Sequence, residues 1–152
     1  MTMGLPPSLK EFIDDLRLLS DRQDRIQALV ALAESFREVG TDTALRPFDE
    51  SHRVPGCESE AFAWVNLDRE GKLALDFAVE NPQGVSAKAL AEVLKRGLNG
   101  EPPDAAARVP EEIIFELFGS ELSMGKSLGL SNMVRLVKAL AREAERSGAA
   151  PG

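Results

Sequence analysis

Residues 59–80, with the sequence SEAFAWVNLDREGKLALDFAVE, set the architecture of the chain because apolar and charged side chains alternate along their second half. The apolar positions there are Leu73, Leu75, Phe77 and Val79, and the charged ones are Lys72, Asp76 and Glu80. Residues 68–71 (DREG) have the composition of a hairpin turn. Successive side chains of a strand point to opposite faces, so this pattern predicts an antiparallel hairpin with one buried and one solvated face.

The first half of the hairpin, residues 59–67, follows the same period of two. One face would carry Ala61, Ala63, Val65 and Leu67, and the other Phe62 and Trp64. A two-stranded hairpin is not stable alone. We therefore expect a third short strand from residues 48–54, and helices over the apolar face.

Helices are predicted on both sides of this hairpin, where apolar side chains recur at helical spacing. Ser8 with Glu11 has the pattern of a capping box, Asp21 precedes the second helix, and Ser86 precedes the third. The expected helical spans are residues 9–19, 21–40, 86–98, 110–119 and 130–146. The resulting order ααβββααα predicts an α+β domain of two layers, a small antiparallel sheet packed against helices.

Composition narrows the class of protein. The chain has 152 residues, so we expect one domain, with a core over residues 8–146 and a frayed tail at 147–152. Its net charge is −7. An acidic chain argues against a nucleic-acid partner. No apolar run approaches the length of a membrane span, and the N-terminus lacks the apolar core of a signal peptide. We expect a cytoplasmic protein without a membrane partner.

The chemistry of the chain centres on residues 52–59, HRVPGCES, which hold the only histidine and the only cysteine. A Pro55-Gly56 turn immediately precedes Cys57, and such a turn can present a thiol at the surface. One cysteine and one histidine cannot supply a structural zinc site or an iron–sulfur cluster. Gly125-Lys126-Ser127 resembles the end of a P-loop, but the first glycine of that motif is missing.

A lone cysteine still suffices to accept a sulfane sulfur, because the product is a persulfide that needs no second thiol. His52 and Arg53 would favour its thiolate, and Glu58 would oppose it. The alternative from these residues alone is a buried cysteine that only packs.

Residues 52–59, followed by Phe62, closely resemble the active-site segment of the SufE family, sulfur-accepting partners of cysteine desulfurases. A second segment, LSMGKSLGL at residues 122–130 with Met133, is similar to the family signature Leu-Ser-Pro-x-Arg-x-x-Gly-Leu-x-x-Met. Lys126 stands where that signature has arginine. The resemblance spans residues 8–145 and implies a SufE/NifU-like fold.

The resemblance implies that Cys57 takes sulfur from a pyridoxal-phosphate-dependent cysteine desulfurase of the SufS type and passes it to a SufBCD scaffold. The chain would be a sulfur-transfer accessory protein rather than a stand-alone enzyme, and it would carry no cofactor, since the pyridoxal phosphate belongs to the partner. Supporting loop residues would be His52, Arg53, Pro55, Gly56 and Ser59, with Lys126 as a candidate partner contact. A homodimer is compatible with this interpretation.

Two other functions share the implied fold. One is a binding module that regulates a desulfurase without carrying sulfur, and the other is a cluster-assembly scaffold of the IscU kind, which a single cysteine disfavours. For the sulfur-acceptor function, we expect free Cys57 to be mostly sheltered and its loop to swing outward about Pro55-Gly56.

Overall fold

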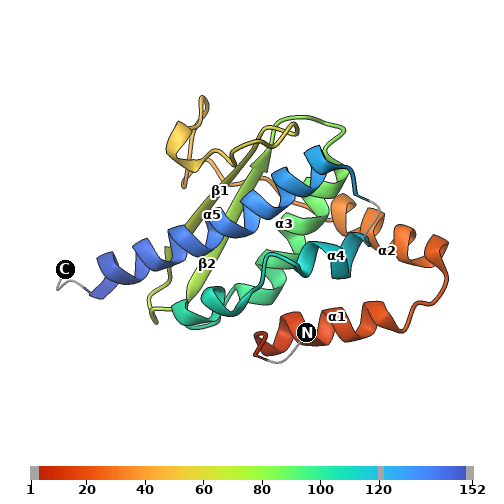
Figure 1. The fold of residues 1–152 in the computed structure, drawn as a ribbon. Coiled ribbons are helices and arrows are strands. Elements are labelled where there is room, and N and C mark those ends of the chain that lie inside the picture. Colours follow the sequence, from red (N-terminus) through yellow and green to blue (C-terminus); the bar gives the residue numbers. More distant parts are fainter. Residues whose placement is uncertain (1–3, 120–121, 150–152) are drawn as a thin grey trace.

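The computed structural model of the protein describes residues 4–119 and 122–149. Within these residues, two helices precede a two-stranded antiparallel hairpin and three α-helices follow it, so the α+β class is confirmed (Figure 1). In chain order the elements are α1 (Pro7–Arg17), α2 (Arg22–Glu34), β1 (Ala61–Leu67), β2 (Leu73–Val79), α3 (Val85–Leu98), α4 (Ile113–Phe118) and α5 (Met124–Ala149). A single 3-10 turn lies at Glu50–His52, and a longer 3-10 helix of six residues lies at Pro103–Arg108.

The hairpin has one thoroughly buried face, as its alternation predicts. In its register Ala63 lies opposite Phe77 and Val65 lies opposite Leu75. The four alternating apolar side chains of β2 are each no more than 6% exposed. The long helix α5 packs across β1 and α3 packs against β2, so the buried face lies beneath these two helices (Figure 1).

The expected third strand at residues 48–54 is wrong. Only a single antiparallel bridge, between Arg53 and Phe62, joins this segment to the hairpin. The segment instead forms the 3-10 turn Glu50–His52, begun by Asp49, whose side chain accepts a hydrogen bond from the Ser51 amide at 2.8 Å. Proline has no N–H to donate, so Pro55 helps end the ladder after one bridge.

The opposite face of the hairpin is less solvated than the alternation predicts. Phe62 and Trp64 on β1 form a second small apolar cluster with Phe48, whose ring centroid lies 5.2 Å from that of Phe62 and 5.0 Å from that of Trp64. The amide of Val39 donates to the Phe77 carbonyl at 2.8 Å, which ties the preceding connection to the edge of β2. A long connection therefore covers the aromatic part of this face.

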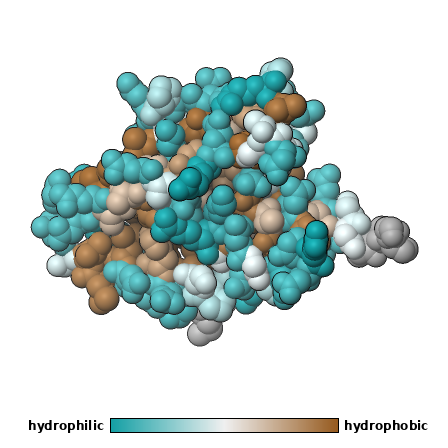
Figure 2. Space-filling model, turned by 180° about the vertical axis from the view of Figure 1, so that it is seen from behind, coloured by the Kyte–Doolittle hydropathy of each residue, from teal (hydrophilic) through white to brown (hydrophobic). Residues whose placement is uncertain are grey.

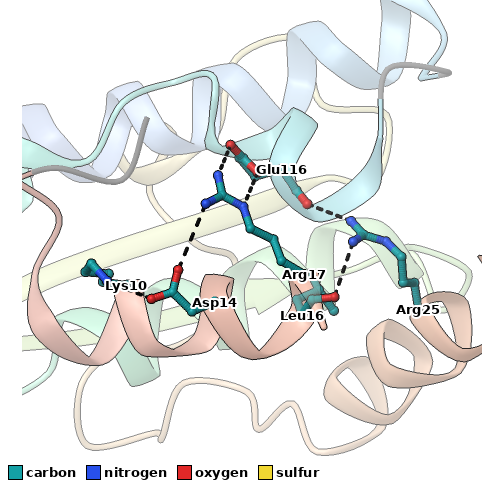
Figure 3. Close-up of polar contacts among 6 residues, drawn as sticks. All are labelled: Lys10, Asp14, Leu16, Arg17, Arg25 and Glu116. Atoms are coloured by element: carbon teal, nitrogen blue, oxygen red, sulfur yellow. Dashed lines mark hydrogen bonds and ion pairs between the residues drawn. The ribbon is translucent and has the colours of Figure 1, made fainter. Parts of the chain in front are cut away.

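Arginine side chains fasten α1, α2 and α4 together (Figure 3). The Arg25 guanidinium donates to the Leu16 carbonyl at 3.3 Å and to the Glu116 carbonyl at 2.8 Å. Arg17 bonds the Glu116 carboxylate at 2.6 Å, which raises the pKa of the arginine. The last carbonyls of a helix lack partners within the helix. Arg25 bonds one such carbonyl of α4 and adds a second donor to the Leu16 carbonyl of α1, which also accepts from the Leu19 amide at 3.1 Å.

Two of the three expected caps are wrong. Ser8 lies inside α1, which begins at Pro7 and has no side-chain cap, and Ser86 lies inside α3, which follows Gly84. Proline suits a first helical position because its fixed φ is helical and its missing N–H would have no partner there. Asp21 caps α2 as predicted, accepting from the Gln23 amide at 2.9 Å.

The second helix and the last helix differ from their expected bounds. Helix α2 ends at Glu34, well before Gly40, and its buried side chains are Leu32 and Ala33. Ile26 and Val30, two apolar residues of this helix that lie four positions apart, are 42% and 40% exposed. Helix α5 runs from Met124 to Ala149 and so includes the start of the tail that was expected to fray, while residues 150–152 lie outside the described part of the chain.

The rear of the molecule is largely hydrophilic, with apolar surface at the end where α1 joins α2 (Figure 2). Exposed apolar side chains of this region are Leu18, Ile26 and Val30. Within residues 4–119 and 122–149, no helix combines the length and the apolar character needed to cross a membrane.

Candidate functional site

Cys57 lies in a turn between the 3-10 turn and β1, and this turn rests on the N-terminal part of α5. The cysteine is half-buried and packs against the main apolar core. It opens onto a small pocket of about 100 Å³. The wall of this pocket comes from the turn itself, from the loop and first turn of α3, and from the first turns of α5.

The backbone of the turn depends on Gly56. Its φ of +67° is in the left-handed region, where a side chain is unfavourable. The Glu60 amide donates to the Cys57 carbonyl at 3.1 Å and closes the turn, and Glu60 itself has a φ of +53°. On the other side, the Val54 amide donates to the Ala61 carbonyl at 2.8 Å. The cysteine is thus held between two hydrogen bonds that belong to the start of β1.

Helix α5 approaches this turn at backbone distance. A Cβ atom at Gly129 would lie 3.1 Å from the Cys57 Cα and 3.2 Å from the Gly56 carbonyl oxygen. One turn further along the helix, the Asn132 side-chain amide donates to the Pro55 carbonyl at 2.8 Å. Glycine at 129 is therefore what allows the cysteine turn to sit directly on α5.

Ser59 fixes the other end of the turn against the loop before α3. A Cβ atom at Gly84 would lie 2.8 Å from the Ser59 Cβ, so this approach also needs a glycine. The Ser59 carbonyl accepts a hydrogen bond from the Asn81 amide at 3.1 Å. Ser59, predicted as a supporting residue, therefore joins the cysteine turn to the loop that leads into α3.

His52 and Arg53 support the turn from the sheet side and do not line the Cys57 pocket. The His52 ring bonds the Ala63 carbonyl through Nδ1 at 2.8 Å and stacks on Trp64 with a centroid separation of 5.2 Å. The Arg53 guanidinium lies 5.5 Å from the centre of the Phe62 ring and 3.6 Å from the Glu60 carboxylate. Both side chains are engaged in anchoring the segment to β1.

The charges around the pocket favour an anion inside it. The first residues of α3 and α5 both line the pocket, and backbone amides at a helix N-terminus attract negative charge. Lys126, exposed on the first turns of α5, adds a positive charge at the mouth. Glu58 opposes both, because its carboxylate lies close to Gly125 at the same helix end.

Sequence reasoning missed Asn132 and Leu128, which contact the turn from α5. Their spacing in the sequence could have identified them. Together with Gly125 and Gly129 they recur every three or four residues and therefore lie on one face of the helix. No group of three or more His, Cys, Asp or Glu side chains in the described part of the chain could hold a metal ion.

The chain is similar to known proteins in sequence and in fold. The family model described as SufE, the Fe-S metabolism associated domain, matches residues 10–141. A solved structure, the solution structure of a hypothetical protein from Thermus thermophilus, is similar to the chain with a TM-score of 0.73 and 28% identity. The similarity covers 92% of this chain and 97% of that one. No curated protein matches the chain.

Proposed function

The chain belongs to the SufE family of Fe-S metabolism associated domains, and from this premise we propose that Cys57 is a sulfur acceptor. It takes persulfide sulfur from a cysteine desulfurase, stimulates that enzyme by clearing its persulfide, and passes the sulfur on to iron–sulfur cluster assembly. The pyridoxal phosphate belongs to the desulfurase. The single-domain organisation and the cytoplasmic location expected from the sequence are parts of the same proposal.

The transfer is a thiol exchange that balances without an oxidant. The Cys57 thiolate attacks the outer sulfur of the desulfurase persulfide, that sulfur's bond to the enzyme breaks, and the enzyme cysteine leaves as a thiolate. Cys57 then carries the persulfide. A thiolate of the next acceptor attacks its outer sulfur in the same way and regenerates the Cys57 thiolate.

The observation that carries this proposal is the pocket beside the only cysteine. Its volume of about 100 Å³ exceeds the roughly 30 Å³ that one water molecule occupies, so an added sulfur atom fits. A persulfide is readily ionised, and the N-termini of α3 and α5 favour its negative charge. Because Cys57 is half-buried, its outer sulfur would be partly shielded from thiols in solution. This shielding is less complete than the mostly sheltered position that we expected from the sequence.

The rim of the pocket suits a protein partner. Three apolar side chains near it are unusually exposed, Val85 by 44%, Met124 by 90% and Leu128 by 52%. Large exposed apolar side chains gathered at one place are typical of interaction sites. A desulfurase that covers them would also exclude water from the transfer.

The test is to incubate the protein with a pyridoxal-phosphate-dependent cysteine desulfurase and L-cysteine. The mass of the SufE-family protein is then measured by mass spectrometry. We expect one added sulfur on Cys57 and faster turnover of the desulfurase. The Cys57→Ser variant should show neither effect while unfolding at nearly the same temperature, since serine keeps the shape of a half-buried side chain. Stimulation by the serine variant equal to that of the wild type would refute the acceptor role and favour a regulatory binding module.

A further inference from the structure

A chain of polar contacts runs from Glu111, just before α4, to the cysteine turn. The Glu111 carboxylate pairs with the Arg135 Nε at 2.8 Å. The Arg135 guanidinium donates to the Asn132 Oδ1 at 3.2 Å, and the Asn132 Nδ2 donates to the Pro55 carbonyl at 2.8 Å. Four residues from three separate segments thereby meet at the peptide that precedes Gly56.

Arg135 decides which way the Asn132 amide faces. A guanidinium only donates hydrogen bonds, so it requires the amide oxygen on its side and leaves the amide nitrogen toward Pro55. Glu111 holds Arg135 in place, and this pairing lowers the pKa of Glu111 and raises that of Arg135. The donor that reaches Pro55 is therefore oriented before the turn docks.

The contact lies where the turn would have to move. Among the residues the structure describes, Asn132 makes the hydrogen bond that joins the cysteine turn to α5, whereas Gly129 and Leu128 contribute packing alone. Pro55 and Gly56 are both exposed. Lifting the turn from α5 would break one side-chain hydrogen bond and leave the bonds of Val54 and Glu60 within the sheet segment intact.

We propose that Asn132 is a positioning residue, a latch that holds the Cys57 turn closed on α5 and opens for sulfur transfer. The proposal rests on the acceptor function of Cys57 for its biological meaning and on the contacts of Pro55, Asn132 and Arg135 for its geometry. While the latch is closed, the outer sulfur stays in the pocket. When it opens, Cys57 moves toward a partner docked at the exposed rim.

The first experiment measures how fast iodoacetamide alkylates Cys57 in the isolated protein. A typical intramolecular hydrogen bond shifts an equilibrium by about two- to tenfold, so Asn132→Ala should raise the alkylation rate by about that factor. Asn132→Asp keeps the side-chain shape but turns an acceptor toward the Pro55 carbonyl, so its effect should be at least as large. Arg135→Ala, which only frees the amide to turn, should have a smaller effect in the same direction.

The matched control is Asn66→Ala, the same change at an exposed asparagine on β1. It should leave the alkylation rate unchanged.

Low urea concentrations separate a local latch from a general loss of stability, because local opening exposes little surface and responds weakly to urea, whereas global unfolding responds strongly. Faster alkylation that is insensitive to low urea supports the latch. An Asn132→Ala rate equal to wild type, or one that rises only through global unfolding, overturns it. If Asn132→Ala does not fold, Arg135→Ala decides by the same criteria.

The second experiment loads Cys57 with sulfur through the desulfurase and measures its release by dithiothreitol. Persulfide on Asn132→Ala should be lost about two- to tenfold faster than on wild type. Equal release rates would contradict the latch. If Cys57 accepts no sulfur at all, the proposed function fails, while the alkylation result still decides whether Asn132 holds the turn.

Discussion

Gly129 on α5 lies directly against the backbone of Cys57, so close that a side chain there would press on the cysteine turn. An added Cβ would be 3.1 Å from the Cys57 Cα and 3.4 Å from its Cβ. The neighbouring atoms are mainly backbone atoms, which cannot turn aside as the end of a flexible side chain can. The position of the thiol over its pocket is therefore set by direct contact between a helix and a turn.

Gly129→Ala should push the cysteine turn away from α5. Alanine gains about 1 kcal/mol of helix propensity, whereas overpacking costs about 1–3 kcal/mol, so we expect a small net loss of stability. Gly125→Ala is the matched control on the same helix, because its nearest neighbour is the flexible end of Glu58 at 3.3 Å. Urea denaturation should place the two variants about 1–3 kcal/mol apart. Iodoacetamide should label Cys57 faster in Gly129→Ala alone, and equal labelling would contradict the contact.

Gly56→Ala should slow sulfur transfer more than it lowers stability. The positive φ of +67° costs an alanine about 1–2 kcal/mol, and the new methyl group would also meet the Leu128 side chain at 3.3 Å. Gly71→Ala has a similar φ of +76° and open space around it, so it isolates the backbone cost. Both variants should lose similar stability in thermal denaturation. Only Gly56→Ala should change the rate of persulfide formation, and an equal change in both would show that the effect is general.

Lys126→Glu should weaken productive encounter with the desulfurase and leave folding unchanged. Its side chain is exposed at the pocket mouth, so reversing its charge removes an attraction for the incoming persulfide anion. We expect kcat/KM for sulfur transfer to fall roughly three- to tenfold at low salt, and the difference to shrink as ionic strength rises. Arg142→Glu makes the same charge change at an exposed position further along α5 and should have little effect. A loss that is equal for both variants would rule out a local role for Lys126.

Asp76→Asn should raise the melting temperature at pH 7. Partial burial raises the pKa of Asp76, more than Lys95 at 3.9 Å lowers it, and Asp42 adds to the rise. A raised folded pKa means that the folded state binds the proton more tightly than the unfolded state. The carboxylate therefore costs stability above its folded pKa, and this cost disappears as pH falls below the unfolded value. Thermal denaturation should show the gain at pH 7 and a smaller one at pH 3, and a variant less stable at pH 7 than wild type would contradict this.

Much of the fold followed from local patterns. The period of two predicted the hairpin and its buried face because alternation is a property of a strand by itself. Helical spacing predicted the positions of the helices, and residues 122–133 together with 52–59 predicted the family. The single cysteine on a Pro-Gly turn identified the candidate site, since no other residue of the chain offers that chemistry.

Other features depended on which segments meet in space. The expected third strand is reduced to a single bridge because its segment instead packs Phe48 against Trp64. Ile26 is exposed because α3 packs against a different face of α2. Sequence alone determined that Cys57 directly follows a Pro-Gly turn. Tertiary structure decided that Gly129 and Gly84 are the points of contact and that Asn132 reaches Pro55, because such contacts join residues far apart in the chain and no local pattern encodes their distance.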